Sequence, residues 1–344
     1  MALAHLLRIN LLWLSVQKCS CRSNAPTPYG EVAGSSSSCL LSEHGGSVSL
    51  LQKAAHSHVG TPGGVSLATS NQSFRTCLNQ YADGLDKVYS NLGSHIRSHP
   101  GTVVARSDRS IILGAGQGTT ATHSLAEGLL QLGRRTAHWL TAPPSYCPWM
   151  CNVSQFVYDE DQGSCRKKYR DFDYTSFPGD DIDAALDSPI PEVFIDVFLS
   201  FPNAKWILTT RPSFEWAQRR VANQVKAMLP VQEPCGQFVD LDVNMTKLAG
   251  LMDLHNELVR CLVPPEKLLE IDVWQGSRDG LMKKLADFLS VELPNLNMSY
   301  PDFFHSNSAH PTRDRKQLFS KMGLVECTDA TPTCSDYFSR LPKH

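Results

Sequence analysis

"SIILGAGQGTTATHSL", residues 110–125, decides the fold of this chain, because it joins an apolar run to a loop with three glycines and then to a helical segment. Glycines at positions 114, 116 and 118 let the backbone turn its amides inward. The helix that follows adds partial positive charge at its first turn. We therefore expect a strand, a glycine loop and a helix that together form a cradle for an anion.

The rest of the sequence continues this alternation of strand and helix. Short apolar runs typical of buried strands cover residues 136–140, 205–210 and 268–273. Apolar residues at helical spacing cover residues 74–96, 213–229, 246–262 and 277–291. The alternation predicts an α/β fold with a mostly parallel sheet flanked by helices. In such a sheet the ligand lies at the carboxyl ends of the strands, where the glycine loop also lies.

The first 75 residues differ in composition from the rest of the 344-residue chain. Residues 1–21 carry a short apolar run interrupted by Arg8, which is typical of a signal peptide or signal anchor; an amphipathic tail or an organelle transit segment is the alternative. Residues 22–75 are rich in Ser, Gly, Pro and Thr and are predicted to form a stalk or linker. Residues 76–344 form the predicted main domain, with a core at about 108–310.

The overall charge excludes two classes of partner. The formal net charge is −2, so nothing global favours nucleic acid or an anionic membrane surface. Contact with a membrane is expected only through an N-terminal anchor. Any anion site must therefore be local, and the glycine loop is the place for it.

Eleven cysteines favour an oxidising compartment. We expect Cys147, Cys151 and Cys165 to staple one insertion, and Cys327 to pair with Cys334. A zinc site at "CPWMC" lacks a second pair of ligands, and no metal is expected. Sequons suit a lumenal glycoprotein and lie at Asn71, Asn152, Asn244 and Asn297. The expected location is the secretory pathway, in the Golgi lumen or outside the cell.

The loop alone does not identify its ligand. The Walker pattern needs a Lys before the hydroxyl residue, and none precedes Thr119. A nicotinamide dinucleotide would use Gly114 and Gly116, but the third glycine comes one residue early and no acid follows at about 20 residues. A glycine turn that only packs a helix against a strand is a further alternative.

Three blocks in order resemble the P-loop-like sulfotransferase family. They are "GQGTTATHSL" (116–125), "DSPIPEVFIDVFLSFPNAKWILTTRPSFEWAQRR" (187–220) and "KLLEIDVWQGSRDGLMKKLADFLSVELPNLNMSYPDFFHSN" (267–307). The resemblance implies the fold of that family and 3′-phosphoadenosine 5′-phosphosulfate (PAPS) as the donor. It also implies transfer of a sulfuryl group to a hydroxyl or amine acceptor, either a small molecule or a glycan.

The resemblance assigns a donor site to residues of this chain. The loop that would hold the 5′-phosphosulfate comprises Gly116, Gln117, Gly118, Thr119 and Thr120. Arg211, at the end of the central strand, would hold the 3′-phosphate, because a guanidinium donates two parallel charged hydrogen bonds.

Two positions depart from the family pattern. A basic residue usually stands two places before the loop glycine, where this chain has Gly116. A serine usually stands eight places after the arginine that corresponds to Arg211. This chain has Arg219 at that position, and we expect Arg219 to contact the 3′-phosphate. Because Gly116 leaves the transferring group without its cation, a non-catalytic nucleotide- or glycan-binding protein stays open as an alternative. An NAD(P)-dependent oxidoreductase is the other.

Sulfuryl transfer also needs a group that accepts the proton of the acceptor. His138, at the end of the second strand, and Asp187, before the central block, are the candidates for this base. Each has a simpler interpretation: His138 as a half-buried strand residue, and Asp187 as the cap of the next helix.

Overall fold

The computed structural model describes most of the region beyond residue 66. The described residues are 67–139, 141–158, 162–176, 182–223, 228–230, 238–240, 244–272, 274–275, 277–293 and 323–327. They belong to one compact unit, Pro62–His344. The predicted signal segment 1–21 and residues 22–66 of the predicted stalk lie outside them.

Seven strands form one sheet, whose order is β8-β5-β1-β4-β2-β3-β9. The strands are β1 (Ile112–Gly114), β2 (Thr136–His138), β3 (Thr141–Ala142), β4 (Ala184–Leu186), β5 (Lys205–Thr210), β8 (Leu268–Asp272) and β9 (Val325–Glu326). The first five in this order run parallel, and β3 and β9 are antiparallel to their neighbours. A separate antiparallel pair joins β6 (Met228–Pro230) to β7 (Phe238–Asp240). The predicted α/β fold with a mostly parallel sheet is confirmed.

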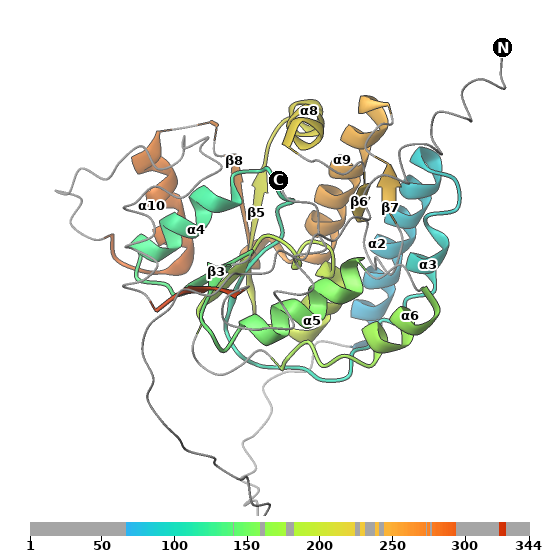
Figure 1. Cartoon of the computed structure of the whole chain (residues 1–344), viewed down its shortest axis with the longest axis horizontal. Helices are drawn as coiled ribbons and strands as arrows, with labels where there is room; N and C mark the ends of the chain where they lie inside the picture. Colours follow the sequence, from blue (N-terminus) through green and yellow to red (C-terminus); the bar gives the residue numbers. More distant parts are fainter. Residues whose placement is uncertain are drawn as a thin grey trace, which may run out of the picture. The chain divides into compact units, whose positions relative to one another are not determined.

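Helices cover both faces of the sheet, because successive strand residues point to opposite sides. In β5, Ile207 packs with α4 (Thr122–Gln131) and α10 (Arg278–Leu289). Its neighbours Trp206 and Leu208 belong to the larger core cluster on the other face, which includes α2 (Leu67–Val88) and α9 (Met245–Leu262). Figure 1 shows α4 and α10 on one side of β5, and α2 and α9 on the other. The other helices of the described residues are α3 (Ser94–Arg97), α5 (Cys147–Tyr158), α6 (Gln162–Arg170), α7 (Phe194–Ser200), α8 (Ser213–Asn223) and the 3₁₀ turn Pro265–Lys267.

Three boundaries differ from those expected. Helix α2 begins at Leu67, inside the segment 22–75 that composition assigned to a linker, because Phe74 is buried in the core. The helix predicted over 74–96 is divided into α2 and α3, and Asn91 between them has a left-handed φ of 71°. The helix predicted over 213–229 ends at Asn223, and Met228–Pro230 is a strand.

Disulfides tie distant parts of the chain together. Cys77 on α2 is bonded to Cys261 on α9, and Cys147 on α5 is bonded to Cys327, which follows β9. The predicted pair of Cys327 with Cys334 is therefore wrong: pairing of β9 with β3 brings Cys327 to the start of α5 instead. Cys151 and Cys165 are disulfide-bonded as well.

Two features are absent from the described ranges. No helix there is both long and apolar enough to cross a bilayer. Within the same ranges, no three His, Cys, Asp or Glu side chains gather as a potential metal site.

Candidate functional site

The sheet topology brings the predicted site residues to one edge. The glycine loop follows β1, and His138 is the last residue of β2. Asp187 follows β4, and Arg211 follows β5. These four strands are parallel neighbours, so their carboxyl ends meet at the same edge, which is where ligands bind in open α/β sheets.

The glycine loop is held from three sides. The hydroxyls of Thr120 and of Thr209 on β5 lie 2.7 Å apart. Trp216 Nε1, on α8, donates a 2.8 Å hydrogen bond to the carbonyl of Gly118. His255 Nε2, on α9, donates a 2.7 Å hydrogen bond to the carbonyl of Ala115. The loop is therefore fixed by side chains from β5 and from two helices.

The backbone of the loop is strained. Thr119 and Ala121 have left-handed φ values of 71° and 67°, although neither is glycine. Such conformations cost of order 1–3 kcal/mol each and persist only where the surroundings impose them. Helix α4 begins directly afterwards, at Thr122. The strain is the kind found at ligand-binding turns.

Gly116 and Gly118 are closely packed. A Cβ atom at Gly116 would collide with the side chain of Thr209 and lie 2.9 Å from both its backbone N and O. A Cβ atom at Gly118 would collide with Nη1 of Arg220 and lie 3.3 Å from Oδ1 of Asp187. Position 116 therefore has no room for a basic side chain unless β5 moves.

Several polar atoms of the predicted donor site are buried without a protein partner. Among the described residues, Gln117 Oε1, Thr119 Oγ1 and Arg211 Nε make no hydrogen bond. Buried polar atoms in native proteins are nearly always satisfied. Thr119 and Arg211 offer donors, so an anionic ligand fits them. The residues present thus fit the 5′ and 3′ anionic groups of the donor that the sequence predicts.

The surroundings of Arg211 favour the binding of an anion. Its guanidinium carbon is 3.5 Å from the ring centre of Trp274. Burial lowers the pKa of Arg211, and the charge of Arg219 lowers it further, whereas Glu215 and Asp272 oppose this. Arg219 itself is exposed. Two like charges in proximity are relieved when an anion binds beside them.

The buried His138 pairs with the largely buried Asp187. Nε2 of His138 lies 3.1 Å from Oδ2 of Asp187 and 3.1 Å from the hydroxyl of Thr122. Burial would raise the pKa of Asp187, but the charge and hydrogen bond of His138, the charge of His123 and the N–H of Ser188 outweigh it. The pKa of Asp187 is consequently held well below its usual range. Asp187 is thus ionised beside the histidine.

The simpler interpretation of Asp187 as a helix cap does not hold. Helix α7 begins at Phe194 and its N-cap position is Val193. Asp187 instead accepts from the N–H of Ser188 and has a left-handed φ of 64°. His138 is a buried strand residue, as its alternative held, and it also faces the site.

The structure adds residues that sequence reasoning did not identify. Trp216 and Arg220 are four residues apart on α8, so they share a helix face, and both contact Gly118. The four-residue spacing of Trp216 and Arg220 is the sequence signal that could have placed both on one face of the helix. His255 reaches the loop from α9, and nothing in its local sequence marks it.

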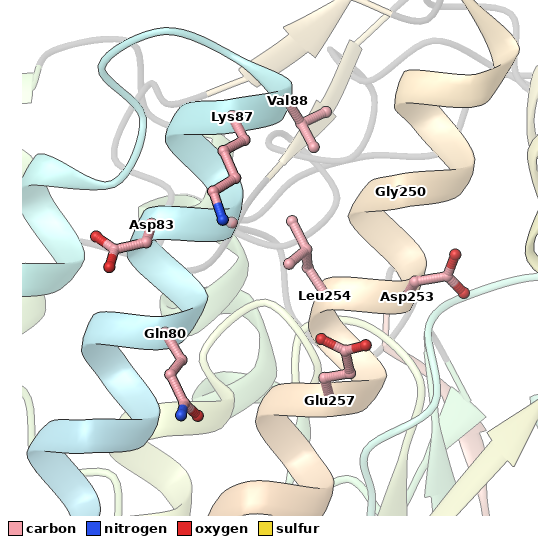
Figure 2. Close-up of a pocket in the computed structure, with 9 residues that line it drawn as sticks. Gln80, Asp83, Lys87, Val88, Gly250, Asp253, Leu254 and Glu257 are labelled. Carbon is pink, nitrogen blue, oxygen red and sulfur yellow. The ribbon is translucent and has the colours of Figure 1, made fainter.

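A hollow of about 580 Å³ lies elsewhere, between α2 and α9. Its lining includes Gln80, Asp83, Lys87, Leu254 and Glu257. Figure 2 shows Leu254 directed from α9 toward α2. None of the predicted site residues lines it, so it is separate from the glycine-loop site.

Comparison with known proteins bears on the family. Residues 111–232 match the family described as "Sulfotransferase domain", and this span contains the glycine loop, His138, Asp187 and Arg211. The structure is similar to the sulfotransferase STF9 from Mycobacterium avium, with 12% identity, coverage of 82% of this chain and 99% of that chain, and a TM-score of 0.31. That score is too low to carry an argument. No curated protein shows significant similarity to the chain. The match contains the strand, the loop and the central arginine, and it shows that residues 111–232 of this chain are similar to a sulfotransferase domain.

Proposed function

We propose that this protein transfers a sulfuryl group from PAPS to a hydroxyl or amine acceptor, such as that of a glycan. The observation that carries the proposal is the convergence of the strained glycine loop, Arg211 and the His138–Asp187 pair at one sheet edge. The sulfotransferase domain match over the same residues supports it.

The donor would be held at both of its anionic ends. The amides of the loop and the hydroxyl of Thr119 would bind the 5′-phosphosulfate, and Arg211 with Arg219 would bind the 3′-phosphate. When bound, PAPS supplies the sulfuryl group and leaves as adenosine 3′,5′-bisphosphate. The protein's share of the work is positioning and stabilisation of charge, as in phosphoryl transfer.

His138 would take the proton of the acceptor. An ionised carboxylate only accepts hydrogen bonds, so Nε2 of His138 carries a proton when it faces Asp187. This tautomer leaves Nδ1 as the nitrogen that can accept a proton. Asp187 thereby orients the ring and stabilises the imidazolium that forms, which is the arrangement known from other histidine bases.

The secretory pathway is the proposed location. Six described cysteines are disulfide-bonded, which supports an oxidising compartment. The sequon residues Asn152 and Asn244 are exposed. Side chains of the other two sequons, at Asn71 and Asn297, are outside the described residues.

The test is transfer of radiolabelled sulfur from PAPS to a panel of acceptors that includes a glycan, a tyrosyl peptide and a small phenol. We expect label in at least one acceptor class and release of adenosine 3′,5′-bisphosphate. Donor binding without label in any acceptor favours the second candidate, a binding protein without turnover, which the glycine at position 116 supports.

A further inference from the structure

The glycine loop lacks a positive charge of its own. Between Ala115 and Ala121 it has no Lys or Arg. Thr209 leaves no space for a side chain at Gly116, so the charge cannot be supplied from that position. A doubly anionic group held by amides alone would lack the charge-assisted contact that strengthens such sites. The structure offers one nearby replacement.

Arg220 on α8 approaches the loop where Gly118 lacks a side chain. Its Nη1 occupies the place that a Cβ atom of Gly118 would need, and the residue is only 7% exposed. Trp216, one turn earlier, binds the carbonyl of the same glycine. The helix thus fixes both the loop and the guanidinium against each other.

The neighbourhood of Arg220 is acidic. Oδ1 of Asp187 lies beside the same point at Gly118, and Arg220 interacts electrostatically with Glu192. Glu192 accepts a 2.6 Å hydrogen bond from the hydroxyl of Ser188, and its Oε2 has no partner among the described residues. Arg220 therefore supplies positive charge where an anionic ligand at the loop would otherwise lie close to the carboxylate of Asp187.

We propose that Arg220 is the cation for the 5′ anionic end of the donor, in place of a basic residue at position 116. The adjacent arginines then serve different ends of the ligand. Consecutive helix residues point about 100° apart, so the two side chains have different surroundings. The charge of Arg219 interacts with that of Arg211, whereas Arg220 lies against the loop. This inference rests on the proposed function, because it presumes a nucleotide with anionic groups at both positions.

Calorimetric binding of three ligands tests the assignment. The ligands are adenosine 3′,5′-bisphosphate, adenosine 5′-monophosphate and adenosine 3′-monophosphate. We expect Arg220→Gln to weaken the bisphosphate and the 5′-monophosphate by at least about tenfold, the size of a lost charged hydrogen bond, and to leave the 3′-monophosphate within about twofold. Arg211→Gln should weaken the bisphosphate and the 3′-monophosphate by the same amount and leave the 5′-monophosphate within about twofold. Arg260→Gln, which breaks an exposed pair with Glu270, is the control for charge removal and should change none of the three.

Thermal unfolding shows whether Arg220→Gln is folded, and two more variants test the inference if it is not. Arg220→Gln with Glu192→Gln removes one charge of each sign, so it relieves the unpaired carboxylate while the cation is still lost. Arg220→Lys keeps the charge and should weaken only the ligands with a 5′ group, because the two-pronged contact is lost. Equal weakening of all three ligands by the folded variants, or no weakening, would overturn the inference and leave the proposed function standing. A folded wild-type protein that binds none of them would overturn both.

Discussion

His138 and Asp187 lie 3.1 Å apart at the ends of β2 and β4, so two residues that the sequence offered as rival bases form one unit. Asp187 follows β4 with a left-handed backbone, which aims its carboxylate at the imidazole. Oδ1 of Asp187 would lie 3.3 Å from a Cβ atom at Gly118 of the glycine loop. The proposed base and the glycine loop therefore share one edge of the sheet.

Removal of this base should affect turnover more than donor binding. We expect His138→Gln to lower kcat/KM by about 10²- to 10⁴-fold, the usual worth of general-base catalysis, with the Kd of adenosine 3′,5′-bisphosphate within about threefold of wild type. Asp187→Asn should lower kcat as well, because the ring loses its preferred tautomer. Unchanged turnover in the His138 variant would remove His138 from the mechanism.

Gly116 should tolerate no side chain. Gly116→Ala places a Cβ atom 2.9 Å from the backbone of Thr209, so we expect a loss of about 1–3 kcal/mol in the free energy of unfolding and weaker donor binding. Gly250→Ala on α9 is the matched control, because its nearest neighbour would be Val88 at 3.5 Å. That change should leave stability unaltered or raise it by up to about 1 kcal/mol. Equal stability of the two alanine variants in denaturant would contradict the packing argument.

The buried His255 should make stability depend on pH. Burial lowers its pKa to about 4, partly opposed by the hydrogen bond to Ala115, from a model-peptide value of 6.5. The unfolded chain therefore takes up this proton first as the pH falls. The contribution is complete above about pH 6.5 and is lost as the pH falls toward 4, by roughly 3 kcal/mol in total.

Comparison with His255→Gln isolates this effect from other titrating groups. The difference in unfolding free energy between wild type and variant should shrink as the pH falls from 7 to 4. A difference that stays constant over this range would show that His255 does not enter the folded state neutral.

The disulfide between Cys77 on α2 and Cys261 on α9 should stabilise the fold without contributing to donor binding. Replacement of Cys77 and Cys261 by alanine should lower the free energy of unfolding by about 2–4 kcal/mol, because the unfolded chain is less constrained. Affinity for adenosine 3′,5′-bisphosphate should remain within about threefold of wild type. A folded double variant that has lost this affinity would mean that α2 and α9 shape the loop more directly than His255 alone implies.

The sequence predicted those elements whose signal is local. The apolar run Lys205–Thr210 and the strand before the glycine loop were both visible as patterns, and they form the adjacent strands β5 and β1. Strand β4 was not predicted, because Ala184–Leu186 is short and lacks β-branched residues. The pairing of Cys147 with Cys327 depends on a β9–β3 contact that no local spacing encodes.

In the candidate site, too, features with a local sequence signal were predictable and long-range contacts were not. Arg211 and His138 were identifiable because each stands at the end of a predicted strand, where parallel topology gathers side chains. Asp187 was singled out only as a carboxylate before the central block, because β4, which it follows, was not predicted. That His138 and Asp187 pair with each other required the strand order, which places β4 between β1 and β2. The contact of Arg220 with Gly118 depends on the packing of α8 against the loop, and the sequence directed attention to Arg219 instead.

Calorimetric titration of the purified protein with adenosine 3′,5′-bisphosphate, with Arg211→Ala alongside, tests the central claim most directly. The account predicts a Kd in the micromolar range or tighter for wild type, and at least about tenfold weaker binding for the variant, because a charged phosphate contact is lost. A folded wild-type protein that does not bind the nucleotide, or an Arg211→Ala variant that binds it as tightly, would contradict the donor site described here.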